Sequence, residues 1–263
     1  MSAVHRPLLA ANWKMHKTVG ESVAFVREWS RRVADGWALP NAAEVELVVC
    51  PTALALAPVA PVLDALGVGL GAQDLDVGSE GAVTGGVSGY LLAEALATHV
   101  IVGHSERRRL FGEADGVVAA KAAAALAAGL TPIVCVGETE AERQAGETKR
   151  VVTGQLRAVL EAVPAADARL TVAYEPLWAI GTGRGAHPAD ASEVASWLRA
   201  LAAERWGAAA GAVRILYGGS VTAGNVLGFW QADAIDGALV GGASLEMESW
   251  LALVRTVAPT PPA

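Results

Sequence analysis

The sequence predicts an α/β protein built as a single (β/α)8 barrel with eight parallel strands. Short β-rich runs alternate with longer helical patterns along the 263 residues. A strand followed by a helix and another strand implies parallel pairing through right-handed crossovers. Eight such units of roughly 30 residues match a closed barrel, which commonly runs to about 250 residues as one domain. An open doubly wound sheet also fits the alternation, since alternation alone does not show closure.

The expected strands are short apolar runs bounded by turn residues. They are Leu8–Asn12, Val45–Cys50, Val68–Ala72, Val100–Val102, Thr131–Val136, Thr171–Tyr174, Val213–Tyr217 and Gly237–Val240. Among the helical patterns, Ser192–Trp206 has apolar residues at i, i+3, i+4 and i+7, and Gly116–Ala128 is alanine-rich, with Lys121 interrupting its apolar run. We expect the barrel to span residues 1–257 and residues 258–263 to form a frayed tail.

Composition excludes several classes of protein. The net charge of -7 argues against a nucleic-acid partner, although a local cluster of donors can still bind an anionic substrate. We find no run of about 18 uninterrupted apolar residues and no signal peptide, so we expect no membrane partner. Cys50 and Cys135 lie in apolar runs and are interpreted as buried thiols of a reducing compartment. The sequence therefore predicts a cytoplasmic protein.

Polar residues cluster where the predicted strands end. In a parallel barrel these ends share one face, where active sites form. Asn12 and Lys14 follow the first strand, His104 follows the fourth and Glu175 follows the sixth. We expect these four side chains to converge although they are far apart in the sequence.

The stretch 171–183 is the most informative part of the chain. Glu175 ends a short strand, and Pro176 stops sheet pairing because its nitrogen carries no proton. Leu177, Trp178 and a glycine-bearing tip follow. This order favours a catalytic carboxylate followed by a lid. On this stretch alone, a charged residue that opens an ordinary turn explains the pattern equally well.

His104 and Lys14 each allow two interpretations. With Ser105, His104 could start a short helix whose positive end disfavours imidazolium, leaving a neutral ring that polarises a carbonyl; the alternative is a capping or core histidine. Lys14 suits a phosphate or a developing oxyanion, yet a lone lysine is more often a surface residue. Glu106 either balances the arginines that follow it or orients Lys14.

Glycine-rich turns follow the seventh and eighth strands, at 217–221 and 239–244. Successive amide protons in such turns bind anions, and phosphate sites of these barrels use the same two loops. Ser220 fits a phosphate contact better than a nucleophile, because no Gly-x-Ser-x-Gly elbow surrounds it. No dinucleotide-binding glycine motif follows the first strand, and the histidines lack metal-site spacing. We expect no cofactor and no metal.

Six segments together resemble the triosephosphate isomerase family, in the family's order and over nearly the whole chain. They are Asn12–Met15, Gly103–Arg108, Val134–Glu138, Tyr174–Gly183, Tyr217–Val221 and Leu239–Leu245. The resemblance implies a cofactor-free aldose–ketose isomerase of glycolysis and gluconeogenesis. Such an enzyme interconverts dihydroxyacetone phosphate and D-glyceraldehyde 3-phosphate through an enediolate, and is usually a homodimer.

The same resemblance implies a role for each matching residue. Glu175 matches the general base, His104 the neutral electrophile, Lys14 the adjacent cation and Asn12 the amide that holds the substrate oxygen, with Glu106 and Ser105 in support. The implied phosphate contacts are Gly181, Ser220, Gly241 and Gly242. The implied lid consists of Pro176, Leu177, Trp178, Ala179, Ile180, Thr182 and Gly183.

Four positions depart from the family's usual pattern. Asp74 stands where asparagine is usual, Val83 where phenylalanine is usual and Gly86 where glutamate is usual. The loop Gly71–Gly89 resembles the family's dimer contact, in which that glutamate pairs with an arginine matching Arg107. Gly185 lies at the second lid hinge and is expected to loosen it.

Two rival functions stay open on the sequence. The departures would fit an isomerase of a four-carbon ketose phosphate, such as erythrulose phosphate, in sugar-alcohol breakdown. The second rival is a non-catalytic phosphate-binding barrel. The presence of all four candidate catalytic residues, Asn12, Lys14, His104 and Glu175, argues against it.

Overall fold

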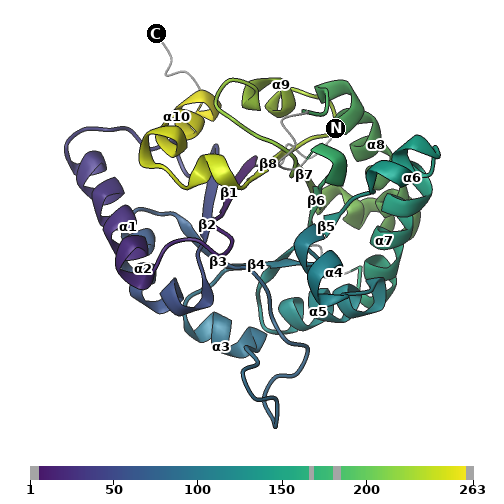
Figure 1. Cartoon of the computed structure of the whole chain (residues 1–263), viewed down its shortest axis with the longest axis horizontal. Coiled ribbons are helices and arrows are strands. Elements are labelled where there is room, and N and C mark those ends of the chain that lie inside the picture. Colours follow the sequence, from purple (N-terminus) through teal and green to yellow (C-terminus); the bar gives the residue numbers. More distant parts are fainter. Residues whose placement is uncertain (1–5, 166–168, 180–184, 259–263) are drawn as a thin grey trace.

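The computed structural model, which describes residues 6–165, 169–179 and 185–258, contains a closed barrel of eight parallel strands (Figure 1). The strands pair in chain order, and β8 closes the barrel against β1. The (β/α)8 prediction is confirmed, and the open sheet is excluded. The strands are β1 (Leu8–Asn12), β2 (Glu46–Cys50), β3 (Gly69–Ala72), β4 (His99–Val102), β5 (Thr131–Val136), β6 (Thr171–Tyr174), β7 (Arg214–Tyr217) and β8 (Gly237–Val240).

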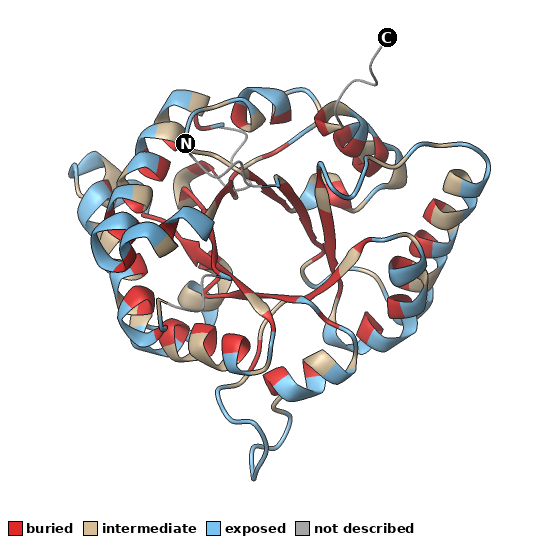
Figure 2. Cartoon of the chain, turned by 180° about the vertical axis from the view of Figure 1, so that it is seen from behind, coloured by how far each residue is buried: buried red, intermediate tan, exposed pale blue. Residues whose placement is uncertain are grey.

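Helices surround the barrel, with buried faces toward the strands and exposed faces outward (Figure 2). No helix in the described ranges is long and apolar enough to cross a membrane. The helices are α1 (Val19–Ala34), α2 (Leu56–Ala65), α3 (Gly89–Glu94), α4 (Ser105–Phe111), α5 (Asp115–Ala127), α6 (Glu140–Gln144), α7 (Thr148–Ala162), α8 (Pro188–Trp206), α9 (Val226–Trp230) and α10 (Met247–Val257), with 3-10 turns η1 (Ala53–Ala55), η2 (Leu177–Ala179), η3 (Gly207–Ala212) and η4 (Gly242–Ser244).

Helix α8 begins earlier than the apolar spacing predicted. The periodic residues start near Ser192, but the helix starts at Pro188. Proline suits the first helical position, because its fixed φ is helical and its missing N–H would have no partner there. The Asp190 carboxylate also accepts the His187 N–H at 3.1 Å.

Small and medium side chains fill the barrel interior, in a cluster that includes Leu8, Val48, Ile101, Ile133 and Leu239. A larger cluster packs between the strands and the helices. Both cysteines are buried and free, as the sequence indicated. The interior is therefore a packed core rather than a channel.

A layer of charged residues lies at the amino-terminal ends of the strands. Arg214 Nη1 lies 2.5 Å and His99 Nε2 lies 3.7 Å from the Glu46 carboxylate. Burial lowers the pKa of His99 to about 4. Burial raises the pKa of Glu46, but His99, Arg6 and Arg214 outweigh it and lower that pKa to about 2. This layer stabilises the end of the barrel opposite the active-site face.

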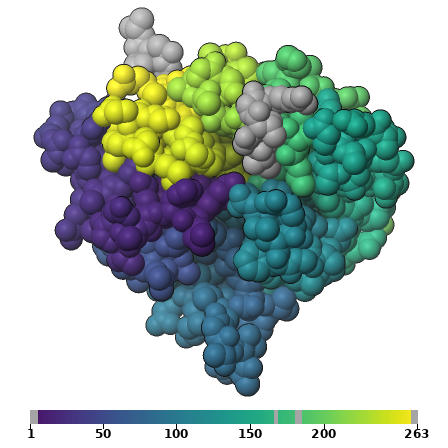
Figure 3. Space-filling model, viewed as in Figure 1, coloured from purple at the N-terminus to yellow at the C-terminus, as the bar shows by residue number. Residues whose placement is uncertain are grey.

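The connection from β3 to α3 projects from the body of the molecule (Figures 1 and 3). Val77 and Val83 are exposed on it. Asp76 holds the loop together by accepting the Val87 N–H at 2.8 Å. A Cβ at Gly86 would lie 2.9 Å from Asp76 Oδ2, so a larger residue would require the loop to shift.

Candidate active site

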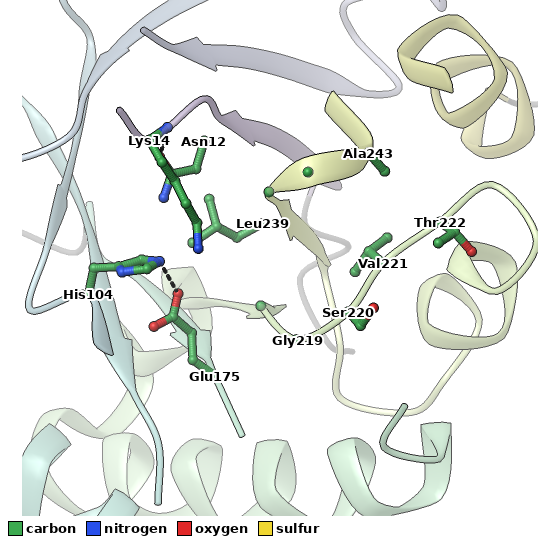
Figure 4. Close-up of a pocket in the computed structure, with 13 residues that line it drawn as sticks. Asn12, Lys14, His104, Glu175, Gly219, Ser220, Val221, Thr222, Leu239 and Ala243 are labelled. Atoms are coloured by element: carbon green, nitrogen blue, oxygen red, sulfur yellow. Dashed lines mark hydrogen bonds and ion pairs between the residues drawn. The ribbon is translucent and has the colours of Figure 1, made fainter. Parts of the chain in front are cut away.

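The carboxyl-terminal ends of the strands surround a cavity of about 280 Å³ (Figure 4). It brings together Asn12, Lys14, His104 and Glu175, which are separated by up to 163 positions in the chain (175 less 12). The remaining lining residues are Gly218, Gly219, Ser220, Val221, Thr222, Leu239, Gly241, Gly242 and Ala243. The expected lid and phosphate residues Ile180, Gly181, Thr182 and Gly183 lie outside the described residues.

Lys14 is held at both its main chain and its ammonium group. Its φ of 50° lies in the left-handed region, which residues with a Cβ rarely adopt. Its N–H donates to Asn12 Oδ1 at 3.0 Å, and its Nζ lies 2.7 Å from Glu106 Oε1. The side chain is only 25% exposed. Of the two interpretations of Glu106, the structure supports the one in which it orients Lys14.

His104 caps helix α4 and also contacts Glu175. Its Nδ1 accepts the Glu106 N–H at 3.2 Å, so in this arrangement the ring proton lies on Nε2. That Nε2 lies 3.1 Å from Glu175 Oε1 (Figure 4). A neutral ring in this tautomer can donate one hydrogen bond into the cavity.

The structure places His104 at the N-terminus of α4, as expected, but Glu175 opposes the effect of the helix on the pKa of the ring. Burial lowers the pKa of His104, but the charge and hydrogen bond of Glu175 raise it by more. The net pKa therefore lies above its ordinary value. The sequence places His104 at the start of a helix but does not show that a carboxylate from β6 lies beside it.

Glu175 is almost fully buried, at 1% exposure. Its Oε2 accepts the Ser105 N–H at 3.0 Å, which gives Ser105 a supporting contact. Burial raises the pKa of Glu175, but the charge and hydrogen bond of His104, with the Ser105 N–H, lower it below the usual range. The carboxylate is therefore ionised, and at the cavity wall it is held by His104 and the Ser105 N–H.

The glycines after β7 and β8 let the main chain approach the catalytic groups. A Cβ at Gly218 would lie 2.8 Å from Glu175 Cγ, and one at Gly241 would lie 3.5 Å from Lys14 Cε. Gly242 begins the η4 turn, and Ser220 lies across the cavity from His104 (Figure 4). These turns line the cavity, and successive amide protons in glycine turns can bind an anion.

The first part of the expected lid is anchored to Glu138. Residues 177–179 form the η2 turn. Trp178 Nε1 donates to Glu138 Oε1 at 2.9 Å, and the Tyr174 hydroxyl donates to the same oxygen at 3.1 Å. The Arg143 guanidinium lies 4.2 Å from the Trp178 ring. Sequence reasoning did not single out Glu138, although it follows β5 on the active-site face and the strand-end rule would have found it.

Asp74 belongs to a cluster of four charged side chains, two acidic and two basic. Its carboxylate contacts Lys121 Nζ at 2.7 Å and Arg107 Nη2 at 2.9 Å. Glu113 also binds both cations, at 2.7 Å from Lys121 and 2.6 Å from Arg107. Arg107 therefore has two carboxylate partners in its own chain, while the glutamate usual in the projecting loop is replaced by Gly86.

The fold and the pocket define an enzyme of the (β/α)8 barrel class, with its acid–base groups at the carboxyl ends of the strands. The family model for triosephosphate isomerase matches residues 7–257. The chain is 50% identical to the triosephosphate isomerase of Symbiobacterium thermophilum over 254 residues, which cover 96% of this chain and 97% of that protein. The corresponding enzymes of Trichlorobacter lovleyi and Thermus thermophilus are each 47% identical, over 95% and 96% of this chain and 98% and 99% of theirs. The chain belongs to the triosephosphate isomerase family.

Proposed function

We propose that this protein interconverts dihydroxyacetone phosphate and D-glyceraldehyde 3-phosphate by proton transfer, without a cofactor. One observation carries the proposal. A buried carboxylate, a histidine whose proton lies on Nε2 and an ammonium group surround one cavity, and two glycine turns form its other side. The family assignment supports the same reaction.

Each group has a step suited to its chemistry. Glu175 takes a proton from the hydroxyl-bearing carbon beside the substrate carbonyl and returns it to the former carbonyl carbon. In the same conversion Nε2 of His104 gives its proton to the carbonyl oxygen and takes the proton of the neighbouring hydroxyl, so that the carbonyl and hydroxyl exchange places. The Nε2–H of His104 also stabilises the enediolate charge that develops on the oxygens, and the Nζ of Lys14 pairs with the phosphate charge at the anionic end of the substrate. One such fixed donor is worth about 3–4 kcal/mol of barrier in oxyanion sites. Asn12, through its side-chain amide, positions both the substrate oxygen and Lys14.

The contacts of Glu175 imply a change of basicity during the reaction. In this arrangement His104 and the Ser105 N–H lower its pKa. When the carboxylate turns to the substrate, it leaves these partners while its burial continues to raise the pKa. Its basicity therefore increases where the proton is taken, and His104 loses the contact that raised its own pKa.

The phosphate group is proposed to bind at the glycine turns. Ser220, Gly241 and Gly242 contribute from the cavity lining, and Gly181 contributes from the lid. Binding energy from this non-reacting end can be used to close the lid segment 176–183 over the reacting carbons. None of the four departures from the family pattern, at Asp74, Val83, Gly86 and Gly185, is among the described residues that line the cavity, so this part of the lining gives no support to a four-carbon substrate.

We also propose that the protein works as a homodimer in the cytoplasm. The loop 71–89 projects from the body and exposes Val77 and Val83. Exposed apolar side chains on a projecting loop are suited to contact with a second copy. The intrachain partners of Arg107 imply that this contact does not depend on a glutamate at position 86. Sedimentation at micromolar concentration would test this, because a fully active monomer would contradict it.

Replacing Glu175 tests the reaction. Glu175→Gln keeps the shape but removes the base, so kcat for glyceraldehyde 3-phosphate should fall by about 10²–10⁴-fold. The affinity for glycerol 3-phosphate, which has no carbonyl, should persist. Glu193→Gln, at an exposed position on α8, is the matched control and should leave both quantities unchanged. An active Glu175→Gln variant would remove Glu175 from the role of base.

A further inference from the structure

Lys14 is in a main-chain conformation that needs support. At a φ of 50° its Cβ is close to the carbonyl oxygen that follows, which makes this region unfavourable for residues other than glycine. A residue remains in such a conformation only when its surroundings hold it there. The Asn12 side chain holds the Lys14 N–H, but the N–H is only one end of the peptide segment.

Gln73 holds the other end. It follows β3, and its Nε2 donates to the Lys14 carbonyl oxygen at 2.8 Å and to the Cys50 carbonyl oxygen at 3.0 Å. Both partners are carbonyl oxygens, which only accept, so the amide nitrogen must face them. The Cys50 oxygen also accepts the Trp13 N–H at 3.1 Å. Gln73 thus connects the turn after β1 to the ends of β2 and β3.

The ammonium group depends on this main-chain geometry. Lys14 Nζ lies 2.7 Å from Glu106 on α4, and its Cε lies 3.5 Å from the Cβ position of Gly241 on the opposite side of the cavity. A rotation of the strained turn would move the whole side chain between these two elements. Glu106 alone restrains only the tip of a long, flexible side chain.

We propose that Gln73 is a positioning residue, which holds the Lys14 main chain so that its ammonium group meets the anionic end of the substrate. For the reaction itself, the inference rests on the proposed function. Lys14 pairs with charge present in both the bound substrate and the transition state, so its misplacement weakens both. The loss should therefore appear mainly in KM, with a smaller change in kcat.

Two substitutions of Gln73 remove its donors in different ways. Gln73→Met keeps the length without any N–H, and Gln73→Glu places a carboxylate against two carbonyl oxygens. Each should raise KM for glyceraldehyde 3-phosphate and Kd for glycerol 3-phosphate by about tenfold, the effect of one lost hydrogen bond. Calorimetry gives Kd, steady-state kinetics gives KM, and thermal unfolding gives Tm.

Asp74→Asn is the matched control. Asp74 is the next residue in the same turn, but its carboxylate binds Lys121 and Arg107, not Lys14. Asp74→Asn should lower Tm while leaving KM and Kd unchanged. A purely structural role for Gln73 predicts the same pattern for Gln73→Met, a lower Tm with unchanged KM and Kd, and this result would overturn the proposal.

The experiment separates this inference from the proposed function. If the unmodified protein binds glycerol 3-phosphate but does not isomerise glyceraldehyde 3-phosphate, the proposed function fails. The inference about Gln73 then stands or falls on Kd alone. Weaker binding in both Gln73 variants supports it, and unchanged binding in either folded variant contradicts it.

Discussion

Gly137 is the position at which one added carbon atom tests the placement of the catalytic carboxylate. It follows β5 directly, beside the end of β6 where Glu175 lies. The Glu175 N–H donates to the Val136 carbonyl oxygen at 2.7 Å, so the two chain segments are in direct contact. Gln155 binds both the N–H and the carbonyl oxygen of Gly137, which limits how far it can move.

The size of the clash follows from the geometry. A Cβ on Gly137 would lie 1.9 Å from the Glu175 carbonyl oxygen, whereas ordinary van der Waals contact begins at 3.4 Å. Gly137→Ala therefore requires a displacement of about 1.5 Å (3.4 Å less 1.9 Å). A misplacement of about 1 Å in an active site can cost about a hundredfold in rate. Overpacking of this kind also destabilises a protein by about 1–3 kcal/mol.

The assay is kcat for glyceraldehyde 3-phosphate together with the free energy of unfolding in urea. We expect kcat to fall by at least about a hundredfold in Gly137→Ala. Gly154→Ala is the control, because Gly154 is exposed on α7 and its Cβ would meet nothing within 4 Å. It should stabilise the helix by about 0.5–1 kcal/mol without changing kcat. A folded Gly137→Ala variant with normal kcat would refute the reasoning.

Two further predictions concern stability. Because the pKa of His99 falls from 6.5 to about 4 on folding, the neutral ring stabilises the fold above pH 6.5, and this contribution is lost as the pH falls toward 4. Between pH 7 and 5 the unfolding free energy falls by about 2 kcal/mol from this source. In His99→Asn, urea unfolding should show an unfolding free energy that falls correspondingly less between these pH values. The same fall in the variant and the unmodified protein would contradict this. Lys121→Met leaves the Asp74 and Glu113 carboxylates without their shared ammonium group and should cost about 3–5 kcal/mol of unfolding free energy. A much smaller loss of unfolding free energy would contradict this, and would show that Arg107 alone neutralises the Asp74 and Glu113 carboxylates.

The order of elements and the convergence of the site could be predicted because both follow from local rules. Apolar runs identify strands, and parallel closure places Lys14, His104 and Glu175 on one face. These rules use only the order and type of residues along the chain. The predicted strand limits therefore agree with the structure to within one residue at each end.

Features that depend on contacts between distant segments could not be predicted. The pKa of His104 is raised by Glu175, which lies 71 positions later (175 less 104). Gln73 is an ordinary polar residue in sequence, and only the folded chain places it against the Lys14 and Cys50 carbonyl oxygens. The absence of a larger side chain at position 86 is likewise explained only by the folded loop, in which Asp76 lies 2.9 Å from the place where a Cβ of residue 86 would be.

The most direct test of the central claim is to follow dihydroxyacetone phosphate and the purified protein in D2O by NMR. Proton transfer through Glu175 predicts rapid conversion to glyceraldehyde 3-phosphate, with solvent deuterium at C2 of part of the product, because a carboxylic acid exchanges its proton with water. Glu175→Gln should slow both the conversion and the deuterium incorporation by about 10²–10⁴-fold. Conversion without any deuterium would indicate direct hydrogen migration between the carbons, and absence of conversion would contradict the proposed activity itself.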